Sequence, residues 1–199
     1  MKKIKMTSFV LMGVLALSAI APLTSAQEIN SDKITPSYID YKSLPVPSHK
    51  QEKSNWCWAA TSQMAIEHLG GNKTQSQIVK YIKGSLVNKG GTDKEVKSAL
   101  EYGGLHSTID KEPIPFGTII SQIKRNQPQL AHIVWKDDSD LGHMYLINGY
   151  SDNTNLGFQK VYYKDPAVGE KMDKIDYYDG FVNNRDFSWY STINEIYVN

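Results

Sequence analysis

Residues 51–60 of the chain read QEKSNWCWAA and include Cys57, the one cysteine of the sequence. From Trp56 to Leu69 apolar residues recur at helical spacing with no proline or glycine among them, and Gly70-Gly71 then provides a stop signal. This pattern predicts a helix that begins close to Cys57. The thiol would therefore lie at the N-terminal end of that helix.

A thiol at a helix N-terminus is placed for nucleophilic chemistry. Only a thiolate attacks a carbonyl, and both the helix dipole and a neighbouring imidazolium favour the anion. Six residues before Cys57, Gln51 could donate its side-chain NH₂ to a developing oxyanion beside the Cys57 backbone N–H. Plainer interpretations stay open: a single cysteine can be a small buried apolar residue or form an intermolecular disulfide, and Gln51 can be a solvated loop residue.

The candidate general base is His143, which follows Gly142 and opens an apolar strand pattern that runs to Tyr150. The candidate orienting acid is Asp165, which would reach the far ring nitrogen if the strand before it pairs with the His143 strand through a hairpin over residues 151–157. A strand-ending turn is the alternative interpretation of Asp165-Pro166.

The remaining histidines have no partner at metal-binding spacing, and they are His49, His68, His106 and His132. The sequence contains no His-Glu-x-x-His motif, no cysteine pair, no acidic calcium loop and no glycine-rich phosphate loop. We therefore expect no metal site and no cofactor.

The order of the predicted elements is helices first and strands afterwards. Capping boxes at Thr74 with Gln77 and at Thr92 with Glu95 start two further helices, and a fourth is predicted over Phe116–Asn126. β-Branched and aromatic runs then predict strands at Gln129–Trp135, Met144–Tyr150, Phe158–Lys164, Lys174–Tyr178 and Ile193–Val198. This order predicts an α+β fold with an antiparallel sheet.

The N-terminal segment has the pattern of an export signal. Three lysines precede an apolar run from Phe9 to Ala21, and small residues close it at Ala26, so we expect a signal peptide over residues 1–26. The run is shorter than the roughly 20 apolar residues of a membrane span. We expect residues 27–44 to be a polar tail or short linker and residues 45–199 to be one domain, secreted and without a stable membrane anchor.

The charge pattern narrows the class of partner. Removal of residues 1–26 takes three lysines and no acid from 22 basic and 21 acidic residues, which leaves a net charge of about −2. The charges are mixed along the chain rather than clustered in a basic stripe. We therefore expect protein or peptide partners and no nucleic acid.

The order of Gln51, Cys57-Trp58, the Gly142-His143 strand opening and Asp165 resembles that of the papain-like cysteine peptidases, in which Gln, Cys, His and Asn or Asp follow in this sequence. The resemblance spans about residues 45–199. It is closest to compact bacterial members, such as staphopain-like secreted peptidases, effector peptidases of plant pathogens and the double-glycine leader peptidase domains of bacteriocin exporters. The WCWAA run at 56–60 and Asp165-Pro166 are similar to the last two groups.

The resemblance implies a papain-like fold with the nucleophile at the start of a central helix, followed by an antiparallel sheet or half-barrel. It implies peptide-bond hydrolysis through a thioester, with Cys57 as nucleophile, His143 as base, Asp165 as orienting acid and Gln51 in the oxyanion hole. The same groups could instead deamidate glutamine or transfer an acyl group to an amine, and a non-catalytic secreted binding module is a further alternative. Partners would be protein or peptide substrates and could include a proteinaceous inhibitor.

Overall fold

The computed structural model describes residues 39–137, 141–169 and 171–198. The expected signal peptide and the expected tail up to residue 38 lie outside these ranges. No helix in the described ranges combines the length and the apolar character needed to cross a membrane.

Five helices lie in the described residues: α1 (Cys57–His68), α2 (Gln75–Lys83), α3 (Asp93–Tyr102), α4 (Phe116–Lys124) and α5 (Tyr178–Val182). The strands in the same residues are β1 (Asp40–Ser43), β2 (Leu105–Asp110), β3 (Gln129–Trp135), β4 (Gly142–Asn153), β5 (Phe158–Lys164), β6 (Asp173–Tyr177) and β7 (Phe187–Val198).

The four predicted helices are present, and the capping boxes account for two of their starts. The hydroxyl groups of Thr74 and Thr92 accept hydrogen bonds from the third residue of their helices, and the side chain of that residue accepts the threonine N–H in return. Helix α1 begins at Cys57 and has no side-chain cap. Helix α4 ends at Lys124, two residues earlier than predicted, because Asn126 leaves the helix with a φ of 66°.

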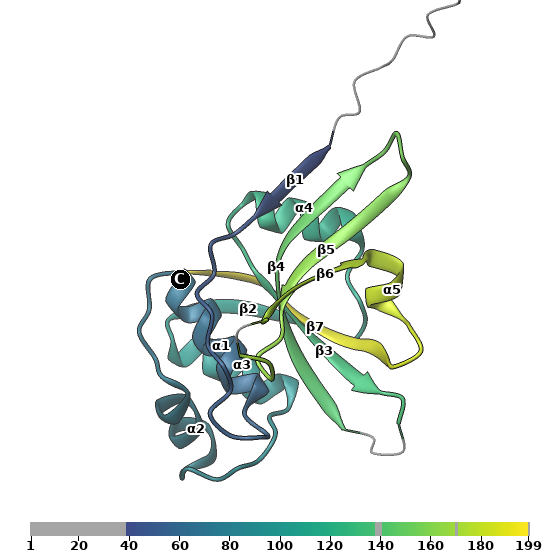
Figure 1. The fold of residues 1–199 in the computed structure, drawn as a ribbon. Helices are drawn as coiled ribbons and strands as arrows, with labels where there is room; N and C mark the ends of the chain where they lie inside the picture. Colours follow the sequence, from purple (N-terminus) through teal and green to yellow (C-terminus); the bar gives the residue numbers. More distant parts are fainter. Residues whose placement is uncertain (1–38, 138–140, 170, 199) are drawn as a thin grey trace, which may run out of the picture. The chain divides into compact units, whose positions relative to one another are not determined.

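The strands form one antiparallel sheet in the order β2-β7-β3-β4-β5-β6, with β1 paired to β4 beside this path. The α+β prediction is confirmed, with α1 to α3 gathered on one side of the strands (Figure 1). The prediction missed β1, β2 and α5, and it placed Tyr178 in a strand whereas Tyr178 begins α5. It also began the last strand at Ile193, six residues after the start of β7 at Phe187.

Strand β4 is the centre of the sheet and its length explains the position of β1. Residues 142–147 of β4 pair with β3, and residues 149–152 pair with β1. Strand β1 therefore pairs with the part of β4 that extends beyond the end of β3. This pairing lies within the segment up to Leu44 that we expected to be a tail or linker, and Leu44 itself is buried.

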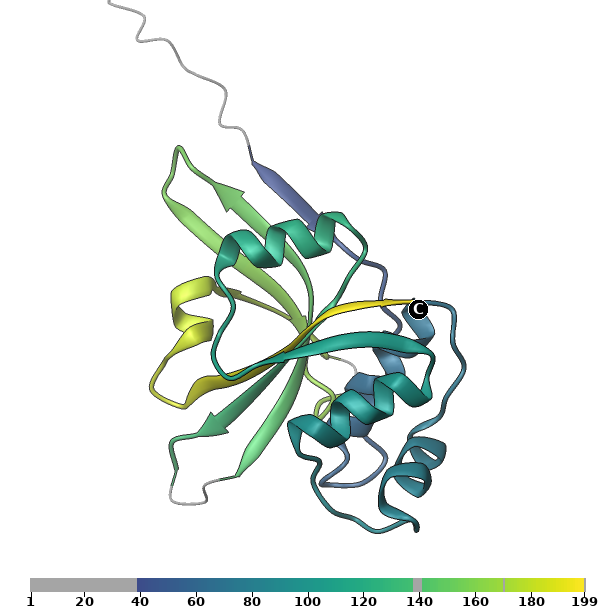
Figure 2. The same cartoon turned by 180° about the vertical axis from the view of Figure 1, so that it is seen from behind.

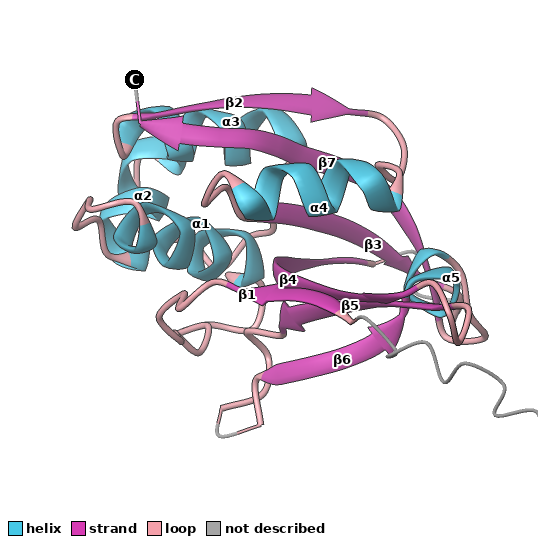
Figure 3. Cartoon of the chain, turned by 90° about the horizontal axis from the view of Figure 1, so that it is seen from above, coloured by secondary structure: helices cyan, strands magenta, loops and turns pink. Residues whose placement is uncertain are grey.

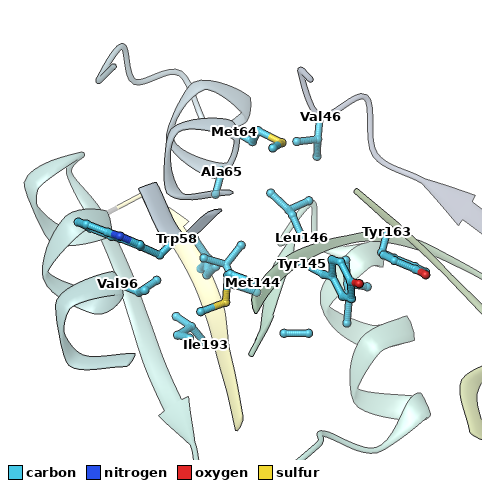
Figure 4. Packing of buried hydrophobic residues seen from close by; sticks show 14 of the residues in the cluster. Val46, Trp58, Met64, Ala65, Val96, Met144, Tyr145, Leu146, Tyr163 and Ile193 are labelled. Atoms are coloured by element: carbon cyan, nitrogen blue, oxygen red, sulfur yellow. The ribbon is translucent and has the colours of Figure 1, made fainter. Parts of the chain in front are cut away.

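The helices cover the sheet in separate places. Helix α1 packs against β4, α3 packs against β2 and β7, and α4 packs against β4 and β1. Figure 2 shows α4 lying across the strands apart from α1 to α3, and Figure 3 shows α5 near the far end of the strands. Side chains from α1, α3, β4 and β7 meet in the buried core, where Trp58, Val96, Met144 and Ile193 lie close together (Figure 4).

Candidate active site

Cys57 is the first residue of α1, it is partly exposed, and its thiol is free. The backbone N–H groups in the first turn of a helix have no intrahelical acceptor, so they are available to a negative charge. The flanking tryptophans, Trp56 and Trp58, are buried, and their indole N–H groups donate to the carbonyls of Val87 and Lys89 at 2.9 and 3.1 Å. Both tryptophans thus fix the loop before α3 beside the cysteine.

His143 and Asp165 are brought together by the β4–β5 pairing. His143 is the second residue of β4, and Asp165 follows the last residue of β5, Lys164, which pairs with Leu146. The imidazole Nε2 lies 2.8 Å from Asp165 Oδ1. The same Oδ1 accepts the backbone N–H of Ala167 at 2.9 Å, which fixes the carboxylate. Because Nε2 faces Asp165, the nitrogen left for Cys57 is Nδ1.

The electrostatic environment keeps His143 charged. Burial by itself would lower the pKa of His143, but hydrogen bonds with Asp165 and Cys57 and the charges of these groups outweigh it and raise the pKa from 6.5 to about 9. Burial would raise the pKa of Asp165, whereas the hydrogen bonds from His143 and from the Ala167 N–H hold it below its ordinary value. At neutral pH the pair is therefore an imidazolium and a carboxylate.

Two aromatic rings contact the imidazole of His143. Trp135, the last residue of β3, lies stacked with it at a centroid distance of 6.0 Å and an interplanar angle of 28°. Tyr145 meets it edge-on at 4.9 Å. These rings leave 10% of the His143 side chain exposed, so the His143–Asp165 hydrogen bond is protected from water. The sequence pattern gave no sign of Trp135, which it showed only as the end of a strand.

Gln51 lies near the same site but is held differently from the expectation. Its Nε2 donates to the carbonyls of Lys53 and Ser54 at 3.0 and 2.7 Å, and its backbone N–H donates to Pro166 at 2.9 Å. Both amide hydrogens are thus used within the loop that leads to Cys57. The Gln51 Oε1 is buried, and no hydrogen-bond donor to it lies among the described residues.

A cleft of about 490 Å³ runs beside Cys57 and His143. One wall is formed by Trp58 and residues 88–91, and the other by Trp135 and residues 141–144. In the first wall, the backbone of Gly91 packs directly on the Trp58 ring. A Cβ on Gly91 would lie 2.5 Å from this ring, so only glycine allows the backbone to come so close. Gln51 and Asp165 are not among the lining residues that the structure describes, so Cys57 and His143 are the predicted site residues that face the cleft.

This arrangement can perform nucleophilic attack followed by proton transfer. It combines a partly exposed thiol, a charged imidazole beside it, a carboxylate behind the imidazole and free backbone N–H groups at a helix start. In residues 39–137, 141–169 and 171–198, no three metal-ligating side chains lie close enough together to hold an ion.

Comparison with known proteins gives a family match and several structures of similar fold. The model of the Peptidase_C39 like family matches residues 43–196. No curated protein matches the chain. The peptidase domain of Streptococcus ComA, a bifunctional ABC transporter, aligns with a TM-score of 0.56 at 17% identity, over 76% of this chain and 97% of that domain.

Two further solved structures have the same fold. A putative C39-like peptidase from Bacillus anthracis aligns with a TM-score of 0.55 at 14% identity, over 78% of this chain and 97% of that one. A double-glycine-motif protease from an AMS/PCAT transporter, solved with its leader peptide, aligns with a TM-score of 0.51 at 18% identity, over 76% and 93% of the two chains. The predicted papain-like fold is thereby confirmed.

Proposed function

We propose, from the premise that this chain belongs to the Peptidase_C39 like family and is a cysteine peptidase, that it hydrolyses peptide bonds with Cys57, His143 and Asp165 as its catalytic groups. The observation that carries the assignment is the environment of His143, whose ring interacts with Cys57 on one side and Asp165 on the other. A buried imidazolium held between a thiol and a carboxylate favours the thiolate, which is the nucleophile in thiol-dependent hydrolysis of peptide bonds.

The reaction proceeds in two halves. The Cys57 thiolate attacks the peptide carbonyl carbon, a C–S bond forms, and the C–N bond breaks as His143 gives its proton to the leaving amine. Water then attacks the thioester and loses a proton to His143, and the C–S bond breaks to release the acid and the thiolate. Asp165 holds the imidazole orientation and balances its charge in both halves.

The oxyanion of each tetrahedral intermediate would be bound by the Cys57 backbone N–H at the start of α1. We propose Gln51 as the second donor. Its Nε2 now donates to Lys53 and Ser54, so one of these hydrogen bonds must be exchanged when the oxyanion forms. The amide would pass from a loop carbonyl to the oxyanion, and because Gln51 is not among the residues that line the cleft, its side chain would have to turn toward Cys57.

Protein or peptide chains are the proposed substrates, and the cleft beside Cys57 is their proposed binding site. The double-glycine-motif protease of similar fold was solved in complex with its leader peptide, which supports a peptide as the substrate. We also propose that the protein acts outside the cell after removal of residues 1–26, from the signal-like pattern in that segment. N-terminal sequencing of protein recovered from culture medium tests the export: a chain that begins at Gln27 supports it, and retention of residue 1 contradicts it.

The peptidase proposal is tested by incubating the purified protein with a library of peptides and reading the products by mass spectrometry. Hydrolysis adds the mass of water across a broken chain, whereas glutamine deamidation changes the mass by about one unit without a break. We expect cleavage by the wild type and none by Cys57→Ala. His68→Ala, at the other end of α1, is the matched control for His143→Ala and should cleave normally. Cleavage by Cys57→Ala would contradict the proposal, and deamidation alone would assign the site to the other reaction.

A further inference from the structure

A second histidine, His132, lines the same cleft as Cys57 and His143. Ile133 of β3 lies opposite His143 of β4, so strand alternation puts His132 on the other face of these two strands. His132, His143 and Gly142 at the start of β4 all line this cleft. His132, which looked in the sequence like a residue inside an apolar strand, is therefore within reach of a bound substrate.

The position of the His132 ring depends on Gly142, the residue directly before His143. A Cβ on Gly142 would lie 2.4 Å from His132 Nε2, so the ring occupies the space that any other side chain would fill. Nε2 of His132 thus lies beside the backbone that carries the proposed base. Of the His132 side chain, 22% is exposed, which is enough to touch a ligand while the rest is enclosed.

Asp93 and Ser191 fix the orientation of this ring. His132 Nδ1 lies 2.8 Å from Asp93 Oδ1, and the Ser191 hydroxyl donates to Asp93 Oδ2 at 2.7 Å. Burial would raise the pKa of Asp93, but the hydrogen bonds from His132 and Ser191 outweigh it and lower the pKa. An ionised carboxylate only accepts hydrogen bonds, so Nδ1 carries a hydrogen. Nε2 has no hydrogen-bond partner in the part of the chain that the structure describes.

The group of Asp93, His132 and Ser191 does not have the geometry of a second catalytic triad. A serine nucleophile must give its proton to a ring nitrogen that is free to accept it. Here the Ser191 hydroxyl donates to Asp93, it lies 3.4 Å from the nitrogen that already carries a hydrogen, and Ser191 is fully buried. The remaining functional atom is His132 Nε2, on the cleft side.

We propose that His132 is a specificity-determining residue, whose Nε2 hydrogen-bonds a polar uncharged side chain of the substrate next to the scissile bond. A carboxamide or hydroxyl group both donates and accepts, so it fits Nε2 whether or not the ring is protonated. An apolar side chain would remove water from Nε2 and leave it without a partner, which selects against such substrates. Asp93 acts as a positioning residue through His132. The inference rests on the proposed function.

The test compares two versions of a peptide that the wild-type protein cleaves in the library. At each position flanking the scissile bond, glutamine is exchanged for methionine, which has similar length and no strong hydrogen-bonding group. We expect kcat/KM to favour glutamine about tenfold at one position, the size expected of a single partly exposed hydrogen bond. His132→Asn keeps a nitrogen near the Nδ1 position for Asp93 but has no group at Nε2, so the preference should disappear. His132→Gln places its amide nitrogen nearer the Nε2 position and should restore part of it.

Two further measurements separate this inference from the proposed function. The rate of Cys57 alkylation by iodoacetamide should be the same in His132→Asn as in wild type, since the reacting groups are unchanged. The dissociation constants of both peptides for Cys57→Ala should show the glutamine preference without turnover. If the ratio of kcat/KM for the glutamine peptide to kcat/KM for the methionine peptide is the same in wild type and His132→Asn, and cleavage still requires Cys57, the inference is overturned and the proposed function stands. Slow alkylation in His132→Asn would show that His132 supports the structure of the site, and this result would also overturn the inference. If no peptide is cleaved, the proposed function fails and the inference fails with it.

Discussion

At the scale of single residues, the two ring nitrogens of His143 have different partners. Nε2 is held by Asp165 at 2.8 Å, and Asp165 is itself fixed by the Ala167 N–H. Nδ1 is left to Cys57, which therefore interacts with a ring that cannot turn without breaking a buried hydrogen bond. In the proposed reaction, this fixed ring would let Nδ1 exchange a proton with Cys57 and with the leaving amine without turning.

The raised pKa of His143 gives a prediction for pH dependence. Its folded value of about 9 lies above the ordinary 6.5, so the imidazolium persists through neutral pH and is lost as the pH rises through about 9. We expect the C2 proton of His143 to titrate near that value by NMR and peptide cleavage to fall in the same range. In Cys57→Ala the midpoint should decrease, since a hydrogen bond and a charge that raise it are gone. A midpoint unchanged by this substitution would show that Cys57 and His143 do not interact.

Substitution of the acid should have a smaller effect than substitution of the base. His143→Ala removes the proton acceptor and should lower kcat about 10²–10⁴-fold. Asp165→Asn keeps an oxygen that can accept from Nε2–H but removes the charge, and we expect a loss of about tenfold in kcat together with a lower His143 pKa. Steady-state kinetics on a cleaved peptide provide the comparison. A larger loss in Asp165→Asn than in His143→Ala would contradict the assigned roles.

The role proposed for Gln51 makes a separate prediction. If its amide joins the oxyanion hole during the reaction, Gln51→Ala should lower kcat by about 10²–10³-fold with little change in KM. Its backbone contact with Pro166 is independent of the side chain, so the loop should keep its place. The melting temperature serves as control. A near-normal kcat would mean that the Cys57 N–H acts without Gln51.

At the scale of elements, β4 organises the site because it pairs with β3, β1 and β5. Its residues 142–147 pair with β3 and carry His143, and its far half pairs with β1 and β5. Gly149 allows the approach of β1: a Cβ there would lie 2.6 Å from the Lys42 carbonyl oxygen and 2.9 Å from Ser43 Cα. These neighbours are backbone atoms and cannot turn away.

Gly149→Ala should therefore destabilise the protein by about 1–3 kcal/mol, the usual range for an overpacked site. Gly117→Ala is the matched control, because Gly117 lies exposed in α4 and a Cβ there meets nothing within 4 Å. That substitution should raise the stability by about 0.5–1 kcal/mol through helix propensity. Urea unfolding of both variants measures the difference. Equal stability of Gly149→Ala and wild type would mean that β1 does not pack against β4 as described.

The elements also show what local sequence can predict. Helices α2 and α3 were predicted from their threonine caps, and β3 and β5 were predicted from short runs of β-branched and aromatic residues bounded by turns. Strands β1 and β2 were not, because their stability comes from partners far along the chain: β1 pairs with β4 and β2 with β7. A short, mostly polar segment that is stabilised by such pairing shows no alternation of apolar and polar residues from which a strand could be predicted.

The same limit applies to the site residues. Cys57, His143 and Asp165 were predicted from their order and spacing, since each lies at the start or end of a predicted element, and the structure brings them together. The contact between Asp93 and His132 joins residues 39 apart on a helix and a strand, and neither has a local signal for the other. Sequence also placed Gln51 near the nucleophile but gave no information on its two carbonyl acceptors.

At the scale of the whole described fold, the cleft lies where the helical part meets the sheet. The proposed nucleophile, Cys57, is the first residue of α1, whereas His143 lies in β4 and Asp165 follows β5. Buried residues such as Met64 and Leu146 belong to one core shared by both parts (Figure 4). Folding of this core and assembly of the site are therefore coupled, and the proposed catalytic groups meet only in the folded protein.

Because the pKa of His143 is raised only when the site is assembled, the free energy of unfolding should depend on pH. A histidine whose pKa is higher folded than unfolded contributes stability that is fully present below about pH 6.5 and is lost as the pH rises through about 9. The free energy of unfolding of the wild type, from urea titrations, should therefore decrease between pH 6 and pH 9.5 more than that of His143→Ala. Parallel decreases in both proteins would show that His143 is not charged in the folded state.

The measurement that tests the central claim most directly is the rate of Cys57 alkylation by iodoacetamide between pH 5 and pH 9, in wild type and in His143→Ala. A thiolate paired with the His143 imidazolium reacts rapidly at pH 6, where an ordinary thiol with a pKa of about 8.5 is almost entirely protonated. We expect fast reaction of the wild type at pH 6 and much slower reaction of His143→Ala at the same pH. Identical profiles for the two proteins, or an inert cysteine in both, would contradict the assignment of Cys57 and His143 as the reacting pair.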